Sequence, residues 1–486
     1  MIYLRNNGMI DYTTYVSPFV ERFATKEMIA LWSPQKKFST WRKCWLALAE
    51  AEKELGLEIS DEQIDELKNH LEDIDFEKAR AYEEQTRHDV MAHILTLGDV
   101  APKAKPIIHL GATSCFVTDN TDAILIREAL LLIRNKIVAI LKRLKSFAIH
   151  YKDLPTLGYT HFQPAQLVTV GKRACLWAQD LVLDLRHIEF FLTEMQCRGV
   201  KGATGTQASF LVLFNGDHEK VKKLDCLIAE KLGFVSSIPV SGQTYTRKID
   251  THVLQILAGI GESVHKFATD LRLLQHMKEI EEPFEKSQVG SSAMPYKRNP
   301  MRSERACALA RFVMGIPIYS GFTTAVQWME RTLDDSAIRR IIIPEAFMAT
   351  DGMLNLYLNI MENPVVYPQV IAKHVREELP FMATESLLMA GVKKGGDRQV
   401  LHEIIRKHAQ SAGEWVKNEG QENDLLERLA NDPDFPLTKE EIMNCLDEKD
   451  FVGRAPQQTE EFVREIIDPI IEKYSKISEI SSSVSV

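Results

Sequence analysis

The chain has 486 residues, of which 45% are hydrophobic and 26% charged, and this balance excludes a chain that is mainly disordered. Its length allows about three domains. The formal net charge of −9 disfavours broad binding to nucleic acid or to an anionic membrane surface.

The seven cysteines lie singly along the chain, without a Cys-x-x-Cys pair. This distribution argues against a disulfide framework and against a zinc site. The first residues lack the basic, apolar and small-residue succession of a signal peptide. No run of about 18 uninterrupted apolar residues predicts a transmembrane helix. We therefore expect reduced cysteines, a cytoplasmic location and no membrane partner.

Two interruptions divide the chain into three predicted domains: an N-terminal helical domain (1–112), a central long-helix bundle (113–364) and a C-terminal helical domain (365–486). The first interruption is the GATS segment at 111–114, and the second is the proline-flanked segment at 364–368. We expect 118–120 to cap the first long helix.

Apolar residues recur at alternating steps of three and four in three proline-free stretches, which are 123–147, 167–195 and 253–274. This spacing predicts helices of about 30 residues, each about 45 Å long. Neighbouring positions off the stripe are also apolar, so such helices need partners on more than one side. The stretches predict a large bundle within the chain, or a bundle completed by other subunits, and we favour the oligomer. No alternating strand pattern is evident, and the chain is predicted to be all-α.

Residues 290–304, with the sequence GSSAMPYKRNPMRSE, do not fit a helix bundle because two prolines interrupt them. On composition alone the segment is either a surface connector or a loop that binds an anionic ligand through backbone N–H groups and cations.

The first ten of these residues resemble the signature loop of the fumarase/aspartase superfamily, whose members release fumarate by β-elimination. The segments GATS (111–114) and THFQPAQ (160–166) resemble the same superfamily, and the similarity extends over nearly the whole chain. Segments 87–93, 241–248 and 330–336 resemble its animal-type branch, which cleaves adenylosuccinate in purine nucleotide synthesis. The resemblance implies a three-domain all-α fold, a homotetramer built on the central bundle, and no cofactor.

For the reaction, the resemblance implies that Ser291 is the general base, with Ser292 as the neighbour most easily confused with it. A serine is a weak base at neutral pH, so its alkoxide needs stabilisation by Lys297 and loop amides. Negative charge that develops beside the substrate carboxylate needs fixed donors, which Lys297 and Asn299 can supply.

The leaving nitrogen must gain a proton, and histidine titrates in the suitable range. His161 lies in a non-helical turn between two long helices; a lone histidine is more often structural, but the resemblance assigns it as the general acid. His88 is expected to contact substrate or support the acid, and His93 to lie in the core. Their i, i+5 spacing is not that of a helical metal pair, so no metal is expected.

A nucleotide phosphate favours arginine, which can bind it with two hydrogen bonds. For any single arginine the alternative is a salt-bridged or solvated side chain. Phe23 stands where we expect tyrosine and offers no hydroxyl. The resemblance assigns to substrate contact Arg22, Phe23, Arg87, His88, Asp89, Thr113, Ser114, Gln243, Lys297, Asn299, Arg305, Arg331, Ser336 and Arg340.

The expected substrates are purine nucleotides: adenylosuccinate, giving AMP, and succinylaminoimidazolecarboxamide ribotide (SAICAR), giving AICAR. One alternative is the branch that cleaves argininosuccinate, but that substrate has no phosphate for Arg331 and Arg340 to bind. Another is a non-catalytic, crystallin-like structural protein, which the intact Ser291, Lys297 and His161 argue against. The resemblance also implies sites shared between subunits, with His161 and Ser291 on different chains.

Overall fold

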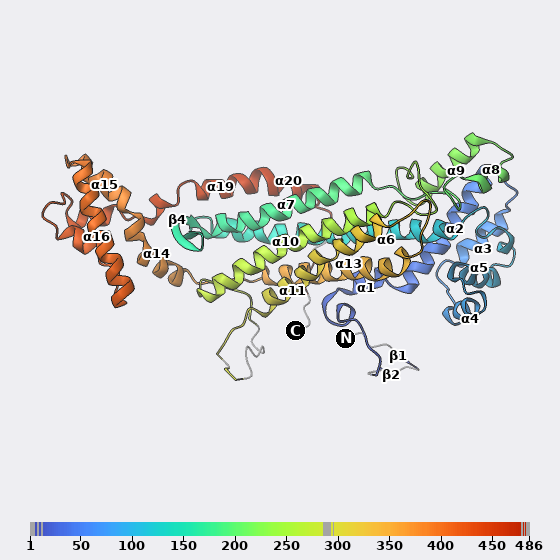
Figure 1. Cartoon of the computed structure of the whole chain (residues 1–486), viewed down its shortest axis with the longest axis horizontal. Helices are drawn as coiled ribbons and strands as arrows, with labels where there is room; N and C mark the ends of the chain where they lie inside the picture. Colours follow the sequence, from blue (N-terminus) through green and yellow to red (C-terminus); the bar gives the residue numbers. More distant parts are fainter. Residues whose placement is uncertain are drawn as a thin grey trace.

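The computed structural model describes residues 5–6, 9–10, 13–284, 293–294, 296–477, 480 and 482. The molecule is elongated along a bundle of long helices, with α2 to α5 at one end and α14 to α16 at the other (Figure 1). The helices are η1 (Phe19–Phe23), α1 (Lys26–Leu31), α2 (Pro34–Glu54), α3 (Asp61–Asn69), α4 (Phe76–Thr86), α5 (Asp89–Val100), η2 (Lys105–Ile107), α6 (Ser114–His150), α7 (Val170–Glu194), α8 (Ala208–Leu213), α9 (His218–Lys231), α10 (Lys248–His276), α11 (Met301–Gly315), α12 (Pro317–Ala325), α13 (Asp335–Ile360), α14 (Pro368–Met382), α15 (Thr384–Lys393), α16 (Arg398–Glu419), α17 (Leu425–Ala430), α18 (Lys439–Asn444), η3 (Glu448–Phe451), α19 (Ala455–Phe462), η4 (Val463–Ile467) and α20 (Asp468–Lys473). The strands pair in antiparallel twos: β1 (Arg5–Asn6) with β2 (Met9–Ile10), β3 (Pro155–Thr160) with β4 (Gln163–Thr169), and β5 (Ile280–Glu281) with β6 (Val365–Val366).

The three apolar stripes become the long helices α6, α7 and α10, which confirms the predicted all-α bundle. The 37 residues of α6 span about 55 Å at ~1.5 Å per residue. Its stripe is fully buried at Leu130, Ile137 and Leu144. Helix α6 packs against α7 and α13, while α10 packs against α11. The bundle core is therefore continuous along the molecule.

Between α6 and α7 the helical bundle is interrupted by a short hairpin of β3 and β4, which the sequence did not predict. Leu157 and Leu167 are buried, but the first four side chains of β4 are exposed, so the sequence shows no alternating pattern. Because Leu167 belongs to β4, α7 begins only at Val170. A Cβ on Gly171 would lie 2.2 Å from the carbonyl oxygen of Ala148, so only glycine permits this close approach to α6.

The predicted cap of the first long helix is also wrong, because α6 begins at Ser114 with Thr113 at its N-cap. Asp119 and Asn120 lie inside the helix and are buried. The Asn120 side chain donates to the carbonyl oxygen of Gly199 (3.2 Å) and accepts from the Gly199 N–H (2.9 Å). Asn120, a residue type typical of helix caps, therefore binds the loop at Gly199 to the side of α6.

The C-terminal part contains a second apolar core, formed by residues between 383 and 442. After it, α19 and α20 return along α7 and the rest of the bundle (Figure 1). Val463 and Ile467 are buried in the main core, and Lys145 forms an ion pair with Asp468 (2.5 Å). The limits proposed at 112 and 364 remain predictions.

Candidate active site

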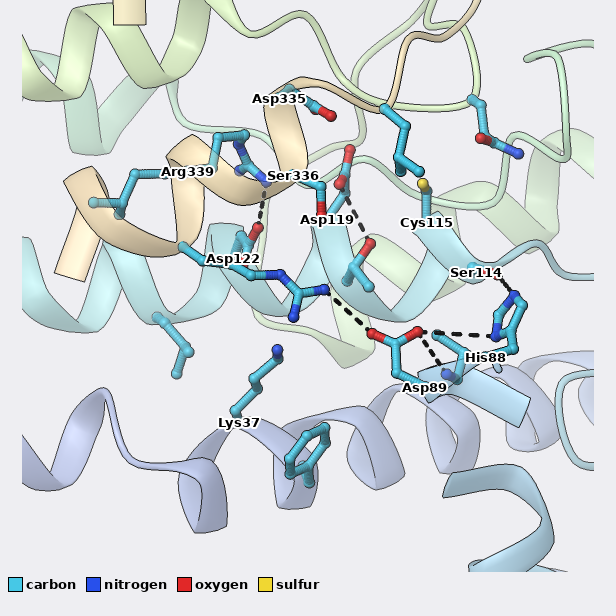
Figure 2. Close-up of a pocket in the computed structure, with 18 of the residues that line it drawn as sticks. Lys37, His88, Asp89, Ser114, Cys115, Asp119, Asp122, Asp335, Ser336 and Arg339 are labelled. Atoms are coloured by element: carbon cyan, nitrogen blue, oxygen red, sulfur yellow. Dashed lines mark hydrogen bonds and ion pairs between the residues drawn. The ribbon is translucent and has the colours of Figure 1, made fainter. Parts of the chain in front are cut away.

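A cavity of about 930 Å³ opens where α6 begins, and it has the size of a small-molecule site (Figure 2). Its walls come from α2, the α4–α5 junction, the first turns of α6 and α13, and the loop before α10. Segments far apart in the sequence therefore meet around one space.

Many of the residues predicted to contact substrate line this cavity. They are Arg87, His88, Asp89, Ser114, Gln243, Arg331, Ser336 and Arg340. Thr113 lies beside them, since its hydroxyl accepts a hydrogen bond from the Gln243 side-chain amide (3.2 Å). The structure thus brings together most of the predicted set from four separate segments.

His88 is held in one orientation by the start of α5. Its Nδ1 accepts from the Met91 backbone N–H (3.3 Å), as an N-cap residue does, and its Nε2 faces the Ser114 hydroxyl at 3.3 Å. A neutral imidazole that accepts at Nδ1 carries its proton on Nε2. Arg87, with φ 55°, ends α4 in the left-handed region, which turns the chain sharply into His88. His93 is instead buried and stacks on Phe38, and burial lowers its pKa to about 4.

The two arginines expected to bind phosphate both have protein partners. Arg340 Nη2 lies 3.3 Å from Asp89 Oδ2, and the Arg340 side chain is 61% exposed. Arg331 Nη2 lies 3.6 Å from Asp335 Oδ1, and its Nη1 lies 3.2 Å from Cys115 Sγ. An exposed pair such as Arg340–Asp89 contributes little free energy, so an anionic ligand can replace the carboxylate at small cost.

A buried ionic framework behind the cavity was missed by the sequence analysis. Arg247 donates to both oxygens of Asp119 (3.2 Å each) and to Asp335 (2.6 Å). Burial acts to raise the pKa of Asp119, but Arg247 and Arg339 hold it below its ordinary value. The signal in the sequence is an aspartate within the apolar α6.

Arg339 forms the second half of this framework. Its guanidinium binds Asp250 (2.6 Å) from α10 and Asp122 (2.8 Å) from α6. The Tyr245 hydroxyl donates to Asp250 (2.5 Å) and accepts from Arg339 (2.6 Å). Removing one partner would leave a buried charge uncompensated, so the framework fixes the turn that carries Arg331 to Arg340.

His161 does not reach this cavity within one chain. It lies at the tip of the β3–β4 hairpin with φ 52°, and its side chain is exposed. Ser114 begins α6, whereas the hairpin follows the end of α6, so the 37-residue helix of about 55 Å lies between them. The prediction that His161 occupies a turn between long helices is confirmed; its role as an acid stays a prediction.

A third group of predicted residues belongs to the signature loop, to α11 that follows it and to η1. The Arg305 guanidinium sits 5.7 Å from the centroid of the Phe23 ring, and burial together with the neighbouring Arg22 lowers the Arg305 pKa. Lys297 is exposed and Asn299 half-buried just before α11. Ser291 and Ser292 lie outside the described residues, so the proposed base remains a prediction.

Comparison with known proteins gives the class of the chain. The fumarate lyase of Mesorhizobium sp. BNC1 superposes with a TM-score of 0.78 at 22% identity, over 91% of this chain and 99% of that one. The family described as Lyase matches residues 11–315, and the family described as Adenylosuccinate lyase C-terminus matches residues 380–462. The chain is a lyase with the fumarase/aspartase superfamily fold, as its motifs predicted.

Two relatives of higher identity give the family. Adenylosuccinate lyase of Saccharomyces cerevisiae is 54% identical over 471 residues, covering 96% of this chain and 98% of the yeast protein. Adenylosuccinate lyase of Schistosoma mansoni is 46% identical over 480 residues, covering 98% of this chain and 100% of the fluke protein. The chain belongs to the adenylosuccinate lyase family.

Proposed function

We propose that the chain releases fumarate by β-elimination from adenylosuccinate, giving AMP, and from SAICAR, giving AICAR. The observation that carries the proposal is the single cavity that holds His88, Ser114 and Gln243 together with Arg331 and Arg340. Such a cavity offers hydrogen-bonding groups for a succinyl end and guanidinium groups for a phosphate. The similarity of the chain to adenylosuccinate lyases over nearly its full length supports the same substrates.

The chemistry assigns one role to each group. Ser291 removes a proton from the carbon beside the substrate carboxylate, and Lys297 and Asn299 stabilise the negative charge that develops on that carboxylate. The carbon–nitrogen bond then breaks, the electron pair stays on nitrogen, and His161 gives the nitrogen its proton. His88, fixed by α5, orients the substrate or supports the acid.

We further propose a cytoplasmic homotetramer with shared sites. The cavity residues, the hairpin with His161, and the cluster of Arg22, Phe23 and Arg305 belong to different regions of one subunit, whereas acid and base must flank one succinyl group. Copies packed with their long helices antiparallel would bring these regions together. The active site would then be built from several chains.

An exposed apolar surface on α11 and α12 supports this assembly. Phe312, Ile318, Tyr319 and Phe322 are 39%, 61%, 56% and 69% exposed. In the described part of the chain, the continuous stretch Met301–Ala325 is long and apolar enough to cross a membrane by length and composition alone, with 39% of its most apolar window buried. Apolar surface of this kind marks an interaction site, and we assign it to contact with other subunits.

The deciding experiment offers the purified protein adenylosuccinate and argininosuccinate separately and measures fumarate from each, with and without a chelator. We expect fumarate from adenylosuccinate alone, at an unchanged rate after chelation. Release from argininosuccinate instead would assign the other branch, and no release from either would favour a structural protein. If chelation abolished fumarate release and added zinc or magnesium restored it, the expectation of a metal-free reaction would be contradicted.

A further inference from the structure

Lys37 of α2 reaches into the cavity from the wall opposite the start of α13. Figure 2 shows its amine pointing away from α2, toward the side of the cavity where Asp122 and Asp89 lie. Its Nζ lies 5.2 Å from the centroid of the Phe38 ring and 5.3 Å from that of Trp41. The two rings shield one side of the ammonium group from water, which leaves its remaining hydrogen-bond donors for the cavity.

Most other cations of the cavity are already paired. Arg247, Arg331, Arg339 and Arg340 each have an ion-pair partner. For Lys37, in contrast, no ion pair within 4.0 Å is found among residues 13–284 and the other described parts of the chain. Burial lowers the Lys37 pKa and Arg340 adds to this, while the carboxylates of Asp122, Asp89 and Glu83 act in the opposite direction.

A half-buried ammonium group without a close counter-ion has lost part of its hydration without full compensation. The preceding residue shows the ordinary arrangement, since Lys36 Nζ pairs with Glu128 at 2.7 Å on the partly exposed side of the same helix. The difference between the two lysines therefore lies in what each faces. Lys37 faces the cavity, where the charges of Asp122, Arg340 and Asp89 act on it.

We propose that Lys37 is a further specificity-determining residue, whose ammonium group binds the phosphate of the nucleotide beside Arg340. This inference rests on the proposed function. The dianionic phosphate would displace Asp89 from Arg340, and the Lys37 ammonium group would be its second positive partner. Lys37 and Arg340 would then both pair with the phosphate.

The test compares Lys37→Met with Lys36→Met in the full-length protein. Lys37→Met keeps the length of the side chain and its contact with the two rings but removes the charge. We expect the KM for adenylosuccinate to rise by about tenfold or more, the range for a hydrogen bond between charged groups, with kcat changed less than about threefold. Lys36→Met should leave both unchanged, and Lys37→Arg should restore most of the KM.

Binding measured without turnover separates this inference from the proposed function. Measured by calorimetry, the affinity for AMP should fall by about tenfold or more in Lys37→Met. The affinity for adenosine, which has no phosphate, should stay unchanged. An equal loss of affinity for AMP and for adenosine, or an unchanged affinity for AMP, would overturn the proposed role of Lys37. If the wild-type protein released no fumarate yet its AMP affinity depended on Lys37, the proposed function would fail and the phosphate contact would stand. Lys37→Gln gives the same comparison should Lys37→Met fold poorly.

Discussion

Glu52 provides the sharpest test of the buried electrostatics. It lies near the end of α2 with no exposed surface, between Ala51 and Lys53 and four residues after the buried Leu48. Both carboxylate oxygens lack a hydrogen-bond partner among the described residues. Burial raises the pKa of Glu52 from 4.5 to about 9, so the folded protein holds this side chain as the neutral acid.

The magnitude follows from proton linkage. Between pH 4.5 and about 9 the folded chain keeps the Glu52 proton and the unfolded chain releases it, so stability is full below pH 4.5 and falls as pH rises. The slope is about 1.4 kcal/mol per pH unit, or about 3 kcal/mol between pH 6 and pH 8. Glu52→Gln removes this titration and keeps the size of the side chain. Any cost of burying the amide is the same at every pH.

The assay is thermal unfolding of the wild type and Glu52→Gln at pH 6, 7 and 8 and constant ionic strength. We expect the Tm of the variant to rise relative to that of the wild type by about 3 °C over this range, because the unfolding entropy of 486 residues is about 1 kcal/mol per kelvin. Glu54→Gln is the matched control, because Glu54 is 49% exposed and pairs with Lys231. A gap between Glu52→Gln and wild type that stays constant with pH would refute the neutral, buried carboxyl.

Three further predictions address the site. Ser291→Ala should lower kcat by about 10² or more while substrate still binds, and Ser292→Ala should do less; the reverse order in steady-state kinetics would reassign the base. Arg331→Ala and Arg340→Ala should raise KM more than they lower kcat, because phosphate lies far from the reacting carbon; a pure kcat loss would place them at the reacting end. His161→Ala and Ser291→Ala are each expected to be inactive. When the two variants are reassembled together, up to about a quarter of the sites should contain both groups and recover activity, if acid and base come from independent subunits. Tagged hybrids that form yet stay inactive would place both groups on one chain.

The sequence was most informative where one physical rule dominates. Long helices must bury an apolar stripe, so spacing alone located α7 and α10 to within about five residues, while α6 begins nine residues before its stripe. The pocket-lining segments were found through motif resemblance, since spacing carries no information about which helix ends meet. Their convergence on one cavity appears only in the fold.

Features that depend on contacts distant in sequence could not be predicted. The β3–β4 hairpin has mostly exposed side chains on β4, so its strands are set by backbone pairing and not by an apolar pattern. Asp119 has the composition of a helix cap, and only the approach of Arg247 from a loop 128 residues away makes it a buried ion-pair partner. Lys36 and Lys37 are equivalent in sequence, yet one pairs with Glu128 and the other faces the cavity.

The length of the helices explains why the candidate groups lie so far apart. In this chain the motifs flank the long helices: Ser114 begins α6 and His161 follows its end, while Gln243 precedes α10 and the signature loop follows it. Loops at helix ends tolerate the irregular backbone that binding requires, but a 37-residue helix separates its own ends by about 55 Å. In the proposed assembly, a second and a third copy laid antiparallel would bring such ends together, and the same packing would cover the apolar side of α11 and α12. The proposed shared catalytic site and the proposed tetramer therefore both follow from the length of the bundle helices.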